Sequence, residues 1–145
     1  MIVRILQIVV PFVWLGLVAG LSFLEAPLKF TAPGITLELG LGIGRLVFFW
    51  LNKIELALAA VFFVSHFLAM PKSGLVKASA AALLVILLLQ TLWLLPALDE
   101  RAVAVISGTS APGSSAHIVY IVLEVVKIIL LPVIGGAVAK RYVQA

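Results

Sequence analysis

Four long runs of apolar residues dominate this sequence: Ile2–Leu24, Leu46–Met70, Lys77–Leu95 and Ile118–Ala139. Each is close to the ~20 residues that an α-helix needs to cross ~30 Å of hydrocarbon. Charged residues make up only 11% of the chain, whereas soluble domains contain about a quarter. We therefore predict an all-α fold: an integral membrane four-helix bundle of up-down-up-down topology, formed as one domain of 145 residues in the lipid bilayer.

The basic residues at the span ends predict the orientation. Five of them, with no acid among them, lie on the amino-terminal side: Arg4, Lys72, Lys77, Lys140 and Arg141. Three lie on the other side, mixed with acids: Lys29, Arg45 and Arg101. Because short cytoplasmic loops carry the excess of Lys and Arg, both termini should be cytoplasmic. We expect the protein in a plasma membrane, most simply a bacterial inner membrane.

The two outer connections differ in composition. Pro27 and Pro33-Gly34 are expected to interrupt the chain after the first span. Thr36, followed by Glu38, then has the pattern of a helix start, so helix two should begin near residue 36, outside the membrane. The second outer connection, Asp99–Ala116, contains a run of Ser and Gly residues that predicts a flexible loop.

The composition excludes several classes of site. The sequence has no cysteine, so disulfide bonds, thiolate metal sites and cysteine nucleophiles are absent. Its basic residues are distributed over the span ends, which does not indicate a nucleic-acid partner. Gly40, Gly42 and Gly44 follow no strand, so we interpret them as helix-packing positions rather than a phosphate loop. Together with Gly16 and Gly20 they favour a homo-oligomer, most simply a dimer.

Charged residues inside the spans are the candidate functional groups, because such groups are costly in hydrocarbon. Glu55 is as far from Met70 as Glu124 is from Ala139, so the two acids are equally far from the inner ends of their spans. At 1.5 Å per residue, both should lie ~22 Å above the inner boundary. Gln90 lies nearly as far above Lys77 on the third span. These positions predict one polar layer in the outer half of the bilayer.

Helical spacing gives the layer further members. On helix two, one stripe contains Asn52, Glu55, Ala59, Phe62 and His66, while Lys53 points away from it. On the last span, a second stripe contains His117, Tyr120, Glu124 and Lys127. His66 lies near the inner end, at a depth similar to that of Gln7. These two residues form a possible inner station if a path crosses the bundle.

The layer supports more than one hypothesis. Lys127 could form a structural ion pair with Glu55 or Glu124. The second acid would then have to carry a proton or hold a cation, as in proton relays. The leading hypothesis is a non-enzymatic protein that binds or translocates a small cationic or protonatable solute. Its predicted binding residues are Glu55, Glu124, Lys127, Gln90, His117, Tyr120 and Asn52.

Two alternatives remain open. One is a membrane-embedded enzyme or accessory subunit with a metal or redox cofactor, for which Glu55, Glu124 and His117 are the candidate ligands. The other is a structural subunit of a larger membrane complex. The sequence names neither a cofactor nor a catalytic residue.

Several short motifs occur together: Trp14-Leu15-Gly16, Gly20, Phe23, Ala26-Pro27, Phe30, Gly44-Arg45, Phe48, Trp93-Leu94-Leu95-Pro96, Arg101-Ala102 and His117. This pattern, which covers most of the chain, resembles the four-span membrane protein family that includes transmembrane protein 205. The resemblance implies a four-helix membrane protein whose long second helix starts outside the membrane, and it implies no established activity. Sulfur-based metal handling would not carry over, because the chain lacks cysteine and has only two methionines.

A faint internal repeat is also present. The separation between Pro27 and Glu55 along the sequence equals the separation between Pro96 and Glu124. Each half would then contain a span, a proline-bearing outer turn and a second span with a glutamate. Parallel repeats of this kind occur in transporters.

Overall fold

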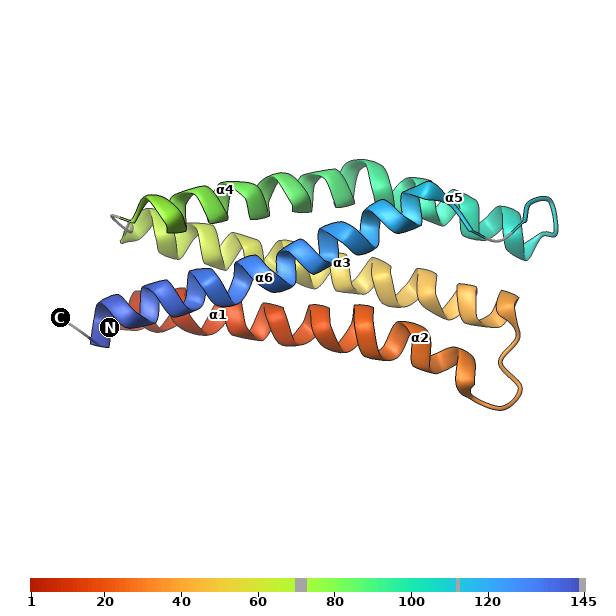
Figure 1. Cartoon of the computed structure of the whole chain (residues 1–145), viewed down its shortest axis with the longest axis horizontal. Helices are drawn as coiled ribbons and strands as arrows, with labels where there is room; N and C mark the ends of the chain where they lie inside the picture. Colours follow the sequence, from red (N-terminus) through yellow and green to blue (C-terminus); the bar gives the residue numbers. More distant parts are fainter. Residues whose placement is uncertain (70–72, 112, 144–145) are drawn as a thin grey trace.

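Four long helical segments, packed side by side, make up the computed structural model (Figure 1). The structure describes residues 1–69, 73–111 and 113–143. Span 1 consists of α1 (Ile2–Val18), the π-helical turn η1 (Ala19–Glu25), α2 (Ala26–Leu28) and the 3₁₀ turn η2 (Lys29–Thr31); span 2 is α3 (Leu37–Leu68); span 3 consists of α4 (Gly74–Leu89), the π-helical turn η3 (Gln90–Leu94) and α5 (Leu95–Ile106); span 4 is α6 (Ser115–Val143). The described residues contain no strand, which confirms the predicted all-α four-helix bundle.

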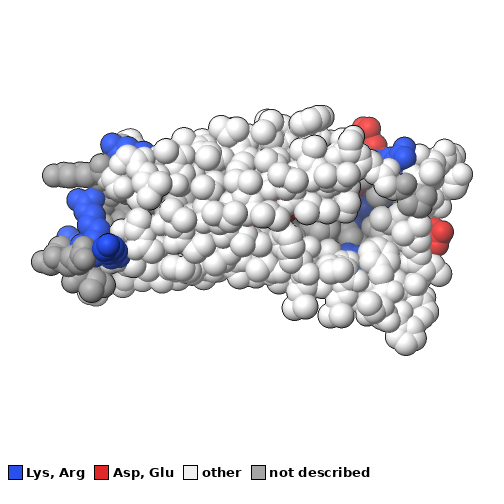
Figure 2. Space-filling view, viewed as in Figure 1, with Lys and Arg blue, Asp and Glu red and all other residues white. Residues whose placement is uncertain are grey.

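All four spans are long and apolar enough to cross a membrane. They contain between 28 and 33 residues, so each extends over ~42–50 Å, more than the ~30 Å of hydrocarbon. Spans 1 and 3 each pack against spans 2 and 4. Both termini lie at one end of the bundle (Figure 1), which we call the inner end. Basic side chains gather at this end, while the middle of the visible surface carries almost no charge (Figure 2).

Helix two starts where the sequence predicts it. The Thr36 hydroxyl accepts a hydrogen bond from the backbone N–H of Leu39 at 3.2 Å, and Glu38 lies in the first turn of α3. An oxygen acceptor at this position satisfies one of the free N–H groups of the helix start. At the inner end, Ser73 caps α4 by accepting from Val76. Met70, the predicted end of the second span, and Pro71-Lys72 of the inner turn lie outside the described residues.

Both outer connections are shorter than predicted. Pro27 does not break span 1, because the π-helical turn η1 continues directly into α2 and the N–H of Ala26 still donates to the Leu21 carbonyl. The chain turns only after Thr31, with Gly34 at a φ of 80°. Likewise, residues Asp99–Ile106 are helical, which leaves residues 107–114 for the second connection. Arg45 of α3 holds Asp99 through hydrogen bonds of 2.6 and 2.9 Å, and this pairing fixes α5 against α3.

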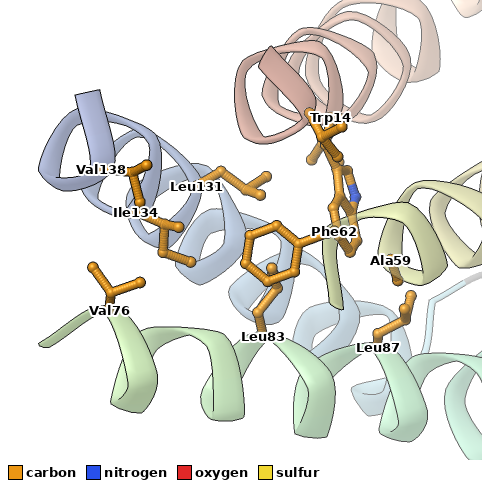
Figure 3. Close-up of a cluster of buried hydrophobic side chains, with 11 residues drawn as sticks. Trp14, Ala59, Phe62, Val76, Leu83, Leu87, Leu131, Ile134 and Val138 are labelled. Carbon is orange, nitrogen blue, oxygen red and sulfur yellow. The ribbon is translucent and has the colours of Figure 1, made fainter. Parts of the chain in front are cut away.

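Buried apolar side chains pack against one another in one core (Figure 3). All four spans contribute to it, and Trp14, Phe62, Leu83 and Leu131 are fully buried. On α3 the core residues Ala59 and Phe62 lie between Glu55 and His66. The core therefore separates the inner end from the depth at which Glu55 and Glu124 lie.

Two π-helical turns support the internal repeat. The N–H of Ala26 donates to the carbonyl of Leu21, and the N–H of Leu95 donates to the carbonyl of Gln90. Both are i→i−5 bonds, and each donor directly precedes a proline. The shift along the sequence that superposes one bond on the other also relates Glu55 to Glu124. The two turns thus occupy matching positions in the two halves of the predicted repeat, which stays a prediction.

Candidate functional site

A buried ammonium group between two carboxylates forms the centre of the polar layer. The Nζ atom of Lys127 lies 2.5 Å from Glu55 Oε1 and 2.8 Å from Glu124 Oε1. None of the three side chains is more than 1% exposed. Glu55 comes from α3, whereas Glu124 and Lys127 lie one helical turn apart on α6. The structure thus places both predicted acids at one depth and on facing helices.

Three further side chains hold the carboxylates from spans 1 and 3. Trp14 Nε1 donates to Glu55 Oε1 at 2.7 Å. Gln90 Nε2 donates to Glu124 Oε1 at 2.8 Å, and Ser22 Oγ donates to Glu124 Oε2 at 3.1 Å. Ser22 and Gln90 both belong to the π-helical turns, so these turns aim donors at the same acid. All four spans therefore contribute to the layer.

Polar contacts continue for one turn toward the outer end. Asn52 Nδ2 donates to Thr91 Oγ1 at 2.8 Å, which links α3 to η3. Tyr120 is buried, and its ring packs edge-on against Phe48 with 5.6 Å between the ring centroids. The Gln90 side chain is fully buried, and its Oε1 atom has no hydrogen-bond partner among the described residues. The layer thus retains one buried acceptor oxygen without a donor.

His117 does not join the layer. It is exposed near the start of α6, ~10 Å above Glu124 by helical rise. The described residues contain no group of three or more His, Cys, Asp and Glu that could hold a metal ion. The predicted set of Glu55, Glu124 and His117 is therefore not assembled as a metal centre. Toward the outer end, the first buried residue of α6 is Tyr120, one turn after His117.

The two residues of the predicted inner station lie on the far side of the apolar core. Gln7 Nε2 donates to the carbonyls of Ser65 and Ala69 at 2.8 Å each, so it links span 1 to the end of α3. His66 Nδ1 lies 2.9 Å from the Phe62 carbonyl, and its buried Nε2 atom has no partner in the described part of the chain. Along α3, His66 is ~16 Å from Glu55 by helical rise. The structure does not connect this pair to the layer.

Two donors on span 1 are absent from the predicted layer. The sequence pattern places Trp14 among the packing or membrane-interface residues, and it gives Ser22 no role. Depth offers a signal for Trp14, since it lies ~18 Å above Ile2 by helical rise and thus near the level of Glu55. Ser22 lies higher on the same scale, and only the π-helical turn brings its hydroxyl to Glu124.

No protein-family model, no curated protein and no solved structure matches the chain. The functional argument therefore rests on the chemistry of the buried layer and on its position in the bundle.

Proposed function

We propose that this membrane protein binds or translocates a small cationic or protonatable solute, and that Glu55, Glu124 and Lys127 form its binding layer. The observation that supports this proposal is the sharing of one fully buried ammonium by two buried carboxylates. If all three groups are ionised, the layer has a net charge of −1. A net charge is costly at this depth, so the layer favours binding one further positive charge, either a proton or a cation.

The surroundings of each acid support such an exchange. Glu55 Oε1 accepts hydrogen bonds from both Trp14 and Lys127. Glu124 Oε2, the oxygen that does not contact Lys127, accepts a hydrogen bond from Ser22. Ser22 is only partly buried, whereas Trp14, Gln90 and Lys127 are fully buried, so Ser22 is the most exposed donor to the two acids. A cation that displaces the Ser22 hydroxyl would bind Glu124, and a proton held there would leave. If Lys127 formed only a structural ion pair, a single carboxylate would be enough to balance its charge, and the second acid would have no role.

The test is the protonation state of the layer. Infrared difference spectroscopy on the protein in liposomes should detect one protonated carboxyl group near neutral pH, or else a bound cation should be found by elemental analysis. Glu55→Gln and Glu124→Gln each leave one carboxylate for Lys127, which makes the layer neutral. Both variants should keep the fold, because glutamine conserves volume and hydrogen bonding, and both should lose the protonated band and any proton-linked flux.

Glu100→Gln is the matched control, because Glu100 is an exposed acid at the outer end. It should retain the band and the flux of the wild type. If the wild type shows neither a protonated carboxyl group nor a bound cation near neutral pH, the three groups are only a structural ion-pair cluster and the proposal is wrong.

A further inference from the structure

A groove opens on the outer part of span 1. Gly20, Leu24 and Leu28 provide apolar lining, and Glu25 and Lys29 provide two charged groups. It is an open groove of about 410 Å³ whose lining residues all belong to span 1 or directly follow it, and Leu24 and Leu28 are more than half exposed. The space-filling view shows that the molecule is hollowed toward its outer end, where basic side chains are visible (Figure 2).

The groove and the buried layer share the π-helical turn η1. Gly20, Leu24 and Glu25 of this turn line the groove, whereas Ser22 of the same turn donates to Glu124. At 3.1 Å, this is the longest of the hydrogen bonds to the two buried carboxylates. One turn of helix, held to the layer by its weakest contact, therefore separates the groove from Glu124.

The two charges of the groove form one ion pair. The Lys29 side chain is 9% exposed, and its Nζ atom lies 3.3 Å from Glu25 and over the Phe30 and Phe48 rings. The Glu25 side chain is 28% exposed, so the acid is the more accessible of the two charges. Behind the groove, the buried layer has two carboxylates around a single ammonium. An incoming ligand thus meets apolar walls and an accessible acid that is paired with Lys29, and the excess of acid lies in the buried layer behind it.

We infer that this groove is the outer binding site for an amphipathic amine. Its apolar body would lie on Gly20, Leu24 and Leu28, and its ammonium would bind Glu25 and then Glu124 in place of the Ser22 hydroxyl. This inference rests on the proposed function and specifies its solute class: an organic cation with an apolar part, which enters from the outer half of the bilayer.

Gly20→Leu tests the groove directly. A Cβ atom at Gly20 would have no heavy atom within 4 Å, so the leucine is accommodated by the backbone and fills the groove. Gly136→Leu is the matched control, because a Cβ at Gly136 is equally unobstructed, but this exposed glycine lies near the inner end of α6. Thermal unfolding should show that both variants are folded.

The probe is 4-phenylbutylamine, compared with 4-phenylbutanoate and 4-phenylbutanol, on protein in lipid nanodiscs against empty nanodiscs. The amine should bind the wild type and the Gly136→Leu variant alike, and the acid and the alcohol should not exceed the lipid background. Gly20→Leu and Glu25→Gln should each weaken amine binding roughly tenfold or more, as expected from the loss of ~1.4 kcal/mol of binding free energy.

Three results would overturn the inference: equal binding of the acid or the alcohol, wild-type binding by both groove variants, or a change of oligomeric state in Gly20→Leu without amine binding. The last result would assign the groove to a second copy of the chain. A wild type that shows the protonated carboxyl band but binds no amine would refute this inference alone. A wild type without the band or a bound cation would refute the proposed function.

Discussion

Lys127 allows two acids to coexist inside the bundle. Its ammonium contacts one oxygen of each carboxylate, and Trp14 and Gln90 donate to the same two oxygens. In a medium of low dielectric constant, an ion left without its partner costs several kcal/mol. The lysine is therefore the residue whose loss should change the layer most.

Replacing Lys127 by methionine should leave both Glu55 and Glu124 protonated at neutral pH, because no buried cation remains to balance a carboxylate. The protonated carboxyl band should grow to two groups. The free energy of unfolding should fall by ~3–5 kcal/mol at alkaline pH, where the acids are forced to ionise, and by less at acidic pH. Infrared spectra and denaturant unfolding in detergent measure the two effects.

Lys53→Met is the control, because Lys53 lies on the outward face of α3 and near the same depth. It should change neither the band nor the unfolding free energy measurably. Identical spectra for Lys127→Met and wild type would contradict the assignment of Lys127 as the counter-ion of both acids.

One part of this site could be predicted from the sequence, and another part could not. Counting residues from the span ends and following the helical stripe were enough to bring Glu55, Gln90, Glu124 and Lys127 together, because charges and amides are rare in spans and an α-helix has a fixed rise. Ser22 could not be found in this way. Hydroxyl residues are common in membrane helices. The position of Ser22 also depends on an i→i−5 hydrogen bond, which no residue type predicts.

At the scale of the helices, close packing at glycine explains the outer part of the fold. A Cβ atom at Gly40 would lie 2.1 Å from the Phe30 ring, and a Cβ at Gly44 would lie 3.2 Å from Lys29 Nζ. Both glycines let the end of span 1 pack directly on α3. The space next to Gly40 and Gly44 is therefore filled by span 1 of the same chain. Of the glycines predicted to form a homo-oligomer interface, Gly16, Gly20 and Gly42 are those with no heavy atom near a Cβ. The oligomer itself stays a prediction.

Gly40→Ala should destabilise the protein by ~1–3 kcal/mol, because the new methyl group forces the Phe30 ring out of its place. Phe30→Ala in the same chain should restore part of this loss by removing the clash. Thermal unfolding in a mild detergent measures both. Gly42→Ala is the matched control: its Cβ has no heavy atom within 4 Å, so its melting temperature should equal or slightly exceed that of the wild type. Equal melting of the two alanine variants would argue against the packing of span 1 on α3.

The contact between α3 and α5 should depend on pH. The pKa of the Asp99 carboxyl is lowered by the hydrogen bonds from Arg45, and both residues lie at the outer end, beyond the apolar parts of their helices. A carboxylate with a lowered pKa stabilises the fold above its ordinary pKa, and this stabilisation is lost as the pH falls through the lowered value. Arg45→Gln should therefore raise the pKa of Asp99 toward its ordinary value.

A ¹³C carboxyl titration of Asp99 measures this shift. Arg101→Gln is the control, since Arg101 binds the carbonyls of Ala111 and Gly113 instead of Asp99. It should leave the Asp99 titration unchanged. A titration that is the same in wild type and Arg45→Gln would show that the pair does not form in solution.

For the whole molecule, the four apolar runs determine the bundle, but they do not determine where it opens. The apolar core closes the inner half, and the groove lies on the outer half, next to the π-helical turn that touches Glu124. A sequence cannot reveal this asymmetry, because the groove lies along span 1 at a turn that departs from α-helical geometry. If the proposed function holds, the asymmetry predicts that the solute enters from the outer side.

Which side is outer can be tested with single cysteines, because the natural sequence has none. The described basic residues at the end with both termini are Arg4, Lys77, Lys140 and Arg141, and no acid lies among them. The positive-inside rule therefore places this end in the cytoplasm. In intact cells, a membrane-impermeant maleimide should label Ala111→Cys in the loop at the opposite end. It should label Ser73→Cys only after the cells are permeabilised. Both positions are exposed and uncharged, so neither substitution alters the charge distribution that sets the orientation. The reverse labelling pattern would leave the geometry of the layer unchanged, but it would make the groove a cytoplasmic-side entrance.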